Sequence, residues 1–181
     1  MPRLNTVDPA TAEPQARALL NKVERALGAT PNMMRAMAES PAVLDAYLSF
    51  SGALAKGRLS GALQEQIALT VAVENECGYC LAAHTVLGER AGVSAADLEA
   101  GRSATASDPK AQAALRFAKA VVAARGFVSD ADLAEVRAAG YGDGEIGEII
   151  AAVALNTFTN YFNSVGRTEL DFPPVAVPSR A

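Results

Sequence analysis

The eleven residues at positions 74–84, ENECGYCLAAH, hold both cysteines of the chain and its only histidine. A helix is predicted over residues 77–91, and side chains three and four positions apart on a helix face the same way. Cys77, Cys80 and His84 are therefore expected to form one stripe, with Cys80 in the middle. A neighbouring imidazole lowers the pKa of a thiol, and the unpaired N–H groups at a helix start stabilise negative charge on either sulfur. The segment thus concentrates the nucleophilic chemistry of the chain in two helical turns.

The spacing of the two cysteines also permits a strained disulfide. Cβ atoms three residues apart on a helix are separated by about 5–6 Å, whereas a disulfide prefers about 3.5–4.5 Å. We expect a bridge between Cys77 and Cys80 to distort the first helical turn and to be reduced easily. Such a bridge suits a catalytic cycle better than a structural role.

A second helix, predicted over residues 60–75, precedes this segment, and the chain is expected to turn back at about Glu74-Asn75. In such an antiparallel pair, Glu65 lies about as far before the turn as His84 lies after it. The carboxylate is then expected to reach the imidazole across the hairpin and to orient it. Were the two helices one continuous helix, Glu65 and Cys77 would lie about 18 Å apart, and this pairing would fail.

The rest of the chain is also predicted to be helical. Ser and Asp before Pro, and Gly after apolar runs, indicate helix starts and stops, and no long stretch follows the two-residue period of a strand. Further helices are expected at about 13–27, 31–39, 41–56, 94–101, 109–125, 130–139 and 144–164. The fold class is therefore all-α, with one helical domain over residues 1–170. Residues 171–181 begin with Asp-Phe-Pro-Pro, which cannot continue a helix. This extended tail is expected either to be disordered or to lie across a neighbouring subunit.

Composition excludes several classes of protein. Of the 181 residues, 50% are hydrophobic, which excludes intrinsic disorder. The net charge of −4 disfavours nucleic acid as a main partner, and no run of eighteen uncharged apolar residues predicts a membrane span. No apolar signal core or targeting tag is found at either terminus, so the protein is expected to be cytoplasmic. In that reducing compartment, two cysteines three residues apart indicate redox or metal chemistry.

Residues 142–147, Gly-Asp-Gly-Glu-Ile-Gly, match the dinucleotide-binding pattern GxGxxG. That pattern binds a pyrophosphate only when it follows a buried strand, and here the preceding residues are predicted to be helical. Asp143 and Glu145 also place negative charge where phosphates would lie. We interpret the segment as a Gly-rich turn into an acidic helix N-terminus.

Two clusters of large apolar side chains are expected to have structural roles. An aromatic cluster near the C-terminus and a methionine cluster near the N-terminus are each predicted to be core or subunit interface. These residues are Phe158, Tyr161 and Phe162, and Met33, Met34 and Met37.

The pattern formed by Glu65, eleven intervening residues and then Cys77-x-x-Cys80-x-x-x-His84 resembles a known signature. It is that of the alkylhydroperoxidase D (AhpD)-like branch of the carboxymuconolactone decarboxylase family. The resemblance implies an all-helical, AhpD-like bundle built around the Cys-bearing helix pair.

The resemblance extends over most of the chain. Residues 28–32 and Ser40-Pro41 resemble the N-terminal part of the peroxidase-related subgroup, and residues 156–163 and 171–173 resemble its C-terminal end. The resemblance also implies a homo-oligomer, since members assemble as dimers, trimers or hexamers.

By this resemblance Cys80 is the peroxidatic thiol, Cys77 the resolving thiol, and Glu65 and His84 the proton relay of a thiol-dependent hydroperoxide reductase. The implied partners are a hydroperoxide substrate and an external dithiol reductant, with no metal, flavin or haem. Well-studied members carry a second His between the cysteines, where this chain has Tyr79. A tyrosine can donate a hydrogen bond, but it cannot shuttle protons near neutral pH.

Several alternatives remain open. The two cysteines could be ordinary buried thiols, or zinc ligands together with His84 and Glu65, although three ligands on one stripe make an awkward tetrahedron. The same dithiol also suits a thiol-disulfide oxidoreductase or a non-enzymatic redox or zinc module. A decarboxylase or lactone-handling enzyme of the family is a further alternative, but that chemistry does not call for a dithiol.

Overall fold

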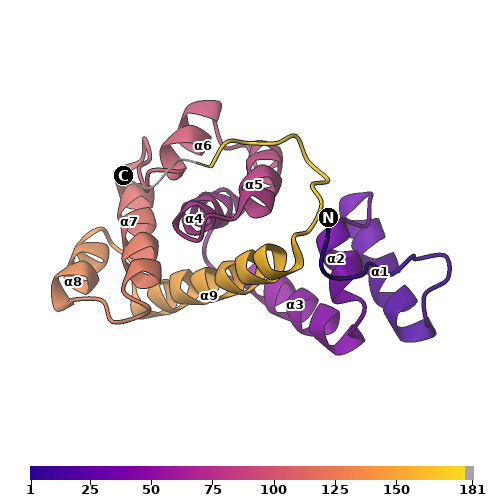
Figure 1. Ribbon diagram of the computed structural model, residues 1–181. Helices are drawn as coiled ribbons and strands as arrows, with labels where there is room; N and C mark the ends of the chain where they lie inside the picture. The colour runs from indigo at the N-terminus through magenta and orange to yellow at the C-terminus, as the bar shows by residue number, and fades with distance from the viewer. Residues whose placement is uncertain (178–181) are drawn as a thin grey trace.

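The computed structural model describes residues 1–177, and in this range the chain is helical with no strand (Figure 1). The helices are α1 (Pro14–Leu27), α2 (Asn32–Met37), α3 (Pro41–Leu54), α4 (Gly61–Glu74), α5 (Gly78–Arg90), α6 (Ala95–Gly101), α7 (Pro109–Ala123), α8 (Asp130–Ala138) and α9 (Asp143–Gly166). The all-α prediction is confirmed, and each predicted helix has its counterpart with ends shifted by at most two residues. Within residues 1–177, no helix has the length and apolar character needed to cross a bilayer.

Helix α4 lies at the centre of the molecule, with α5, α6, α7 and α9 around it (Figure 1). Its residues 66–72 are all buried, because opposite faces of the helix belong to two different hydrophobic cores. Leu69 and Ala72 join the core formed with α1, α2 and α5, whereas Ile67 and Val71 join the core formed with α7, α8 and α9. A helix that is apolar all round has to be enclosed on every side, and this enclosure fixes the position of α5 beside it.

The turn between α4 and α5 is short. Asn75 caps the end of α4, Glu76 adopts a left-handed φ of 54°, and Cys77 caps the start of α5. The Cys77 N–H donates to the Ala72 carbonyl across the turn at 2.8 Å. The predicted antiparallel pair is therefore present, with the turn at residues 75–77.

Gly88 lets α4, α5 and α6 approach one another closely. A Cβ atom at this position would lie 2.6 Å from Leu98 Cδ2 and 3.6 Å from the Cβ atom of Glu65. Any larger residue at position 88 would therefore push α6 away from α5. The missing side chain brings α5 close to the part of α4 that carries Glu65.

The GxGxxG segment is a helix start, as predicted. It follows α8 rather than a strand, Gly142 is the residue before α9, and the Gly142 N–H donates to Glu145 Oε2 at 2.9 Å. The acidic side chain thus caps the helix that it opens, and the segment has no features of a phosphate-binding loop.

The described part of the tail, residues 171–177, has no helix and packs against its own chain. Phe172, Val175 and Val177 contact the core that contains both cysteines, and Figure 1 shows the segment passing from the end of α9 over α5. The disorder that the sequence offered as one alternative does not describe these residues, and the other alternative, a position across a neighbouring subunit, stays a prediction. The segment packs against the core because doing so removes its three apolar side chains from water. Residues 178–181 of the predicted tail lie outside the described residues.

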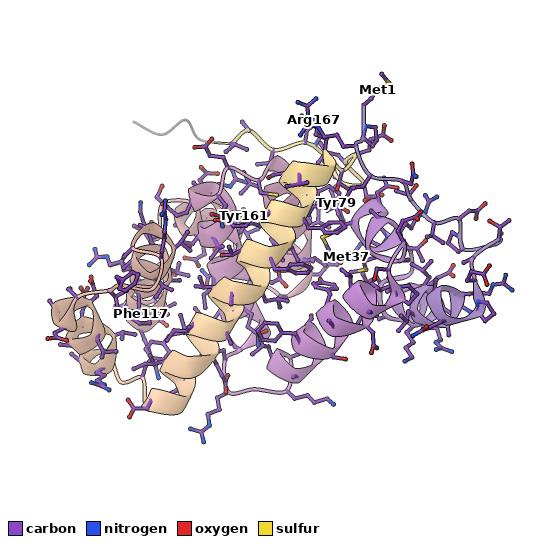
Figure 2. The ribbon with its side chains drawn as sticks, turned by 60° about the horizontal axis from the view of Figure 1, so that its bottom comes forward. Met1, Met37, Tyr79, Phe117, Tyr161 and Arg167 are labelled. Atoms are coloured by element: carbon purple, nitrogen blue, oxygen red, sulfur yellow. The ribbon has the colours of Figure 1, made fainter. Side chains whose placement is uncertain are left out.

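The aromatic cluster on α9 is only partly core. Phe162 packs against the core, but Phe158 and Tyr161 are 41% and 60% exposed, and Figure 2 looks onto the helix that carries them. The core part of that prediction is therefore wrong for these two residues, because they lie on the side of α9 that faces away from α4. The methionine cluster is buried, as predicted: Met33, Met34 and Met37 each have 7% exposure or less.

Candidate active site

Cys77 is the N-cap residue of α5 rather than a member of its helical stripe. Its backbone is extended, with φ −90° and ψ 95°, and its Sγ accepts a hydrogen bond from the Cys80 N–H at 3.3 Å. The predicted single stripe is therefore wrong for Cys77, because a side chain at the N-cap folds back over the free N–H groups of the first turn. A bond between the two sulfurs would replace this capping contact, and Cys77 would not have to be pulled out of helical geometry.

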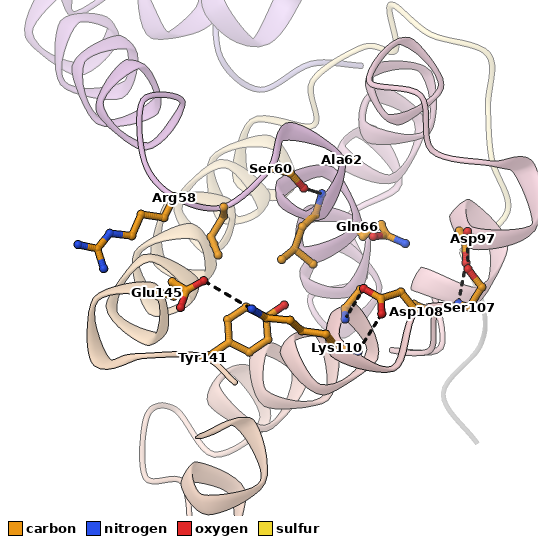
Figure 3. A pocket seen from close by; sticks show the side chains of 14 residues that line it. Arg58, Ser60, Ala62, Gln66, Asp97, Ser107, Asp108, Lys110, Tyr141 and Glu145 are labelled. Carbon is orange, nitrogen blue, oxygen red and sulfur yellow. Dashed lines mark hydrogen bonds and ion pairs between the residues drawn. The ribbon is translucent and has the colours of Figure 1, made fainter. Parts of the chain in front are cut away.

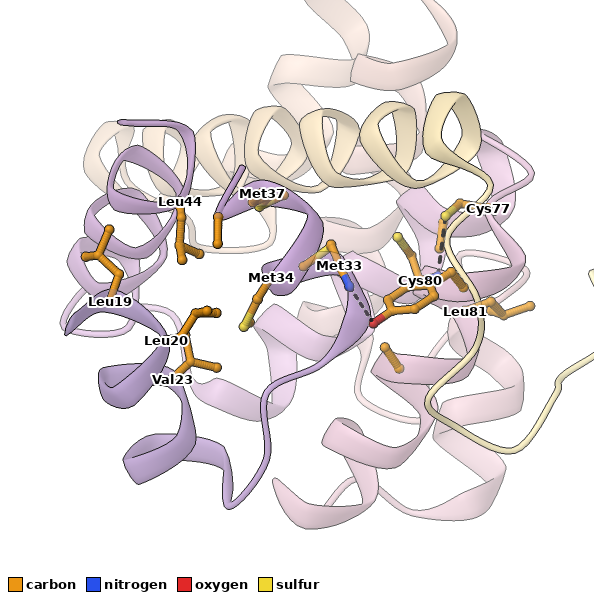
Figure 4. Packing of buried hydrophobic residues seen from close by; sticks show 14 of the residues in the cluster. Leu19, Leu20, Val23, Met33, Met34, Met37, Leu44, Cys77, Cys80 and Leu81 are labelled. Carbon is orange, nitrogen blue, oxygen red and sulfur yellow. Dashed lines mark hydrogen bonds between the residues drawn. The ribbon is translucent and has the colours of Figure 1, made fainter. Parts of the chain in front are cut away.

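Both sulfurs are buried thiols, and Cys80 is the one surrounded by donors. Each cysteine is 2% exposed, and Figure 4 shows them in the core beside Met33. A hydrogen bond from Cys77 lowers the pKa of the Cys80 thiol; burial opposes this, and the positive charge of His84 and the amides of Asn163 and Asn160 reinforce it. The net effect is a pKa below the ordinary thiol value.

The pKa of Cys77 moves in the opposite direction. It is raised because Cys77 donates its proton to Cys80, and because burial and the negative charge on Cys80 both disfavour a second thiolate. The pair therefore shares one negative charge, which resides on Cys80.

His84 and Glu65 form the predicted pair across the α4–α5 hairpin. His84 Nδ1 lies 2.7 Å from Glu65 Oε2, and the two side chains retain 20% and 22% exposure. A carboxylate only accepts hydrogen bonds, so Nδ1 carries the proton. Burial opposes protonation of the imidazole, but the charge and hydrogen bond of Glu65 and the charge of Cys80 together raise the pKa of His84 above its ordinary value. These shifts favour a protonated imidazole beside Glu65 and an ionised thiol at Cys80.

Three further residues face Cys80 that the site pattern in the sequence did not identify. Asn163 Nδ2 lies 3.3 Å from Cys80 Sγ, and Asn160 is on the same face of α9 one turn earlier. Tyr47 from α3 is partly buried, and burial together with the negative charges of Cys80 and Glu65 raises its pKa to about 12. The signal in the sequence was a pair of Asn residues at helical spacing among apolar neighbours. Asparagine is a poor helix former and rarely buried, so its presence there indicates a polar partner.

Tyr79 holds the C-terminal tail. Its hydroxyl donates to Asp171 Oδ2 at 2.6 Å and lies 3.5 Å from the Met33 N–H, and Asp171 Oδ2 also accepts from the Asn32 N–H at 2.8 Å. The Phe172 ring packs edge-on against Tyr79, with centroids 5.9 Å apart. Burial, together with the hydrogen bond and charge of Asp171, raises the pKa of Tyr79, so this hydroxyl stays protonated. Tyr79 and Asp171 thus fasten the tail over the first turn of α5.

Breaking the hydrogen bond between Tyr79 and Asp171 should make the cysteines more accessible to solvent. Asp171→Ala removes the acceptor shared by Tyr79 and Asn32, whereas Tyr79→Phe removes one of the two hydrogen bonds. Asp171 is exposed, so each of its two hydrogen bonds contributes about 0.5–1 kcal/mol, and we expect native alkylation by iodoacetamide to be about tenfold faster in Asp171→Ala and intermediate in Tyr79→Phe. The exposed tyrosine Tyr161 supplies the control, because Tyr161→Phe should leave the rate unchanged. Equal rates in all variants would show that the tail does not limit access.

A separate cavity of about 350 Å³ opens beside the N-terminal part of α4, where α7 and α9 also begin (Figure 3). Its lining includes Gln66, Lys110 and Tyr141, and Lys110 Nζ lies 4.5 Å from the centroid of the Tyr141 ring. Neither cysteine lines this cavity, nor does the Glu65–His84 pair. It is therefore not the space in which the dithiol would meet a substrate.

The described residues contain no group of three or more His, Cys, Asp or Glu side chains placed to hold a metal ion. Cys77, Cys80, His84 and Glu65 share one region, but their contacts are paired, sulfur with sulfur and imidazole with carboxylate. This arrangement gives the zinc alternative no geometric support.

The fold and the site together define an all-α protein with a Cys-x-x-Cys-x-x-x-His dithiol on an AhpD-like helical bundle. Residues 41–120, which include Glu65, Cys77, Cys80 and His84, match the Carboxymuconolactone decarboxylase family. This match covers 80 of the 181 residues, and together with the AhpD-like fold it confirms the resemblance noted in the sequence.

Solved structures of similar fold cover nearly the whole chain. An uncharacterized peroxidase-related protein from Ralstonia eutropha JMP134 with an alkylhydroperoxidase AhpD core is 23% identical, with a TM-score of 0.85 over 94% of this chain and 92% of its own. A peroxidase-related protein from Silicibacter sp. TM1040 is 23% identical, with a TM-score of 0.76 over 97% and 96%. The debrominase Bmp8, in its C82A form with 2,3,4-tribromopyrrole, is 20% identical, with a TM-score of 0.81 over 93% and 91%. No curated protein matches the chain in sequence.

Proposed function

We propose that this protein is a thiol-dependent hydroperoxide reductase. The observation that carries the proposal is the asymmetry of the dithiol: Cys80 accepts hydrogen bonds and lies near His84, whereas Cys77 donates. A nucleophilic thiol has to be a thiolate at working pH, and its partner has to remain available as a thiol. The match of residues 41–120 to the Carboxymuconolactone decarboxylase family and the peroxidase-related structural neighbours support the same assignment.

In the first step the Cys80 thiolate attacks the terminal oxygen of the hydroperoxide. The O–O bond breaks, its electron pair leaves with the alkoxide, and the sulfur is oxidised to sulfenic acid. The alkoxide takes a proton from the His84 imidazolium, which Glu65 orients through Nδ1. The organic product is an alcohol.

In the second step Cys77 attacks the Cys80 sulfur. The raised pKa of Cys77 depends on the negative charge of Cys80, and that charge disappears when Cys80 becomes a sulfenic acid. Cys77 then ionises more readily, forms the S–S bond and expels hydroxide, which is protonated to water. An external dithiol reduces the disulfide and completes the cycle.

The rival functions receive less support. A thiol-disulfide oxidoreductase has to bring a partner sulfur to the dithiol, yet both cysteines are 2% exposed beneath the tail, which favours a small hydroperoxide as first substrate. Decarboxylation or lactone chemistry does not require two cysteines. The debrominase among the structural neighbours means that this fold serves more than one reaction, so the choice has to rest on the site.

The proposal predicts a fixed stoichiometry. Reduced protein without any donor should consume one equivalent of cumene hydroperoxide and lose two titratable thiols, and continuous turnover should require dithiothreitol. The measurements are peroxide consumption and thiol titration of the unfolded protein, with zinc content determined in protein purified without chelator. Unchanged thiols, or more than half an equivalent of zinc, would contradict the proposal.

A further inference from the structure

The longest helix places three asparagine side chains in the protein interior. Asn156, Asn160 and Asn163 on α9 have exposures of 7%, 0% and 3%. A buried amide without hydrogen bonds is destabilising by about 1–3 kcal/mol, so each of these side chains calls for a partner. The partner of Asn156 is plain, because its Nδ2 donates to the Ala152 carbonyl at 2.9 Å.

In Asn160 and Asn163, only one of the two polar atoms of each side-chain amide has a hydrogen-bond partner. Asn160 Oδ1 accepts from Asn75 Nδ2 at 2.9 Å, and Asn163 Nδ2 lies 3.3 Å from Cys80 Sγ and 3.1 Å from Met33 Sδ. Among the described residues, Asn160 Nδ2 and Asn163 Oδ1 are buried with no partner at hydrogen-bond geometry, although the Asn160 amide lies close enough to Cys80 to help lower the pKa of its thiol. One unpartnered donor and one unpartnered acceptor therefore remain beside the candidate nucleophile.

These two atoms match the hydrogen-bonding capacity of a single hydroxyl group. A hydroxyl needs an acceptor for its proton and a donor for its oxygen, and here the acceptor is Asn163 Oδ1 and the donor Asn160 Nδ2. Asn163 Oδ1 is bonded to the same carbon as the Nδ2 that contacts Cys80 Sγ, and Asn160 lies one helical turn away on the same face. Both atoms are thus placed near the sulfur that the proposed reaction oxidises.

We propose that Asn160 and Asn163 bind the terminal O–H group of a hydroperoxide and then the hydroxyl of the Cys80 sulfenic acid that it becomes. This inference rests on the proposed function and specifies its substrate class. When the Cys80 thiolate attacks, the terminal oxygen keeps its hydrogen and moves from oxygen to sulfur, while the other oxygen leaves as alkoxide. The same hydroxyl is present before and after the step, so the same two amides can hold it throughout. Peroxides without an O–H group cannot donate to Asn163 Oδ1 and should react more slowly.

The test uses a Cys77→Ser background, in which oxidation stops at the Cys80 sulfenic acid. Two rate constants are measured at one pH: oxidation of Cys80 by cumene hydroperoxide and alkylation of Cys80 by iodoacetamide. Both reactions use the same thiolate and need the same access, so a changed thiol pKa or a loosened helix cancels in their ratio. Only binding of the hydroperoxide O–H group alters the ratio.

We expect Asn160→Leu and Asn163→Leu each to lower this ratio by about tenfold, the usual effect of losing a hydrogen bond to the reacting group. Asn160→Asp provides a second variant if the leucine variants do not fold, because it keeps the acceptor used by Asn75 and removes the donor; the negative charge that it adds shifts the thiol pKa, which enters both rate constants alike. Asn156→Leu is the matched control: it removes a buried amide from the same helix and should leave the ratio unchanged.

The outcomes separate the inference from the function on which it rests. If the Cys77→Ser protein is oxidised by hydroperoxide and the ratio is the same in every Asn variant, the amides do not bind the hydroxyl and the inference is wrong. If Cys80 is alkylated but hydroperoxide does not oxidise it, the proposed function fails, and the inference fails with it. An equal decrease in Asn156→Leu would show a general effect of helix polarity and would also overturn the inference.

Discussion

Cys80→Ser should abolish hydroperoxide turnover, with a loss of roughly a thousandfold or more. The reaction depends on a sulfur that exists as a thiolate and can accept an oxygen atom, and a serine hydroxyl does neither near neutral pH. Loss of a covalent nucleophile has effects of this size in other enzymes. The side chains are similar in shape and Cys80 lies within a helix, so the helical content measured by circular dichroism should not change.

Cys77→Ser is the matched variant, because it alters the neighbouring sulfur and keeps Cys80. A serine at the N-cap can still accept the Cys80 N–H and donate to the thiolate, so this variant should reduce one equivalent of hydroperoxide at a rate near that of the native protein. It should then stop, since no resolving thiol is present, and the sulfenic acid should be trapped by dimedone. If turnover continues unchanged in Cys80→Ser, Cys80 is not the nucleophile. If the single-turnover reaction is lost only in Cys77→Ser, the two cysteines have the opposite roles.

His84→Asn should lower hydroperoxide turnover by about 10²–10⁴-fold, the range typical of a positioned general acid or base. The variant loses the imidazolium that protonates the leaving alkoxide and that stabilises the Cys80 thiolate. Its pH dependence gives an independent measurement. Because the pKa of Cys80 is lowered in the native protein, the rate of its alkylation should rise with pH below the range of an ordinary thiol. In His84→Asn, which lacks the positive charge, this rise should occur at higher pH.

Glu65→Gln provides the graded control for the same interaction. A glutamine can still accept a hydrogen bond from His84 Nδ1, but it lacks the negative charge that raises the pKa of the imidazole. We expect a smaller loss of turnover than in His84→Asn, and a His84 titration, followed by NMR, that shifts to lower pH. If His84→Asn changes neither the rate nor the alkylation profile, the imidazole takes no part in the chemistry.

The local pattern of the sequence predicted most of the fold. The Gly residues after apolar runs and the Ser or Asp caps placed the helices to within two residues, because caps and stops act within one helical turn. The reach from Glu65 to His84 was also predictable, since two helices joined by a three-residue turn have to lie antiparallel, and equal offsets from the turn then bring side chains level.

The local spacing of the sequence did not predict the position of Cys77. The spacing Cys-x-x-Cys predicted one helical stripe, but the structure starts the helix one residue later, and the sulfur becomes its cap. A one-residue shift of a helix end lies within the ordinary uncertainty of such boundaries. Here that shift changes how the two sulfurs contact each other.

The sequence by itself determined the inventory of the site: one dithiol, one imidazole and one carboxylate at offsets that a single hairpin brings together. Tertiary structure decided what surrounds Cys80, because its other neighbours come from segments distant in the chain. Asn160 and Asn163 reach it from α9, and Asp171 holds Tyr79 from the tail. No local spacing specifies such contacts. They exist because α4 is enclosed on all sides and α9 packs against both α4 and α5, and it is this packing that places polar amides beside a buried sulfur.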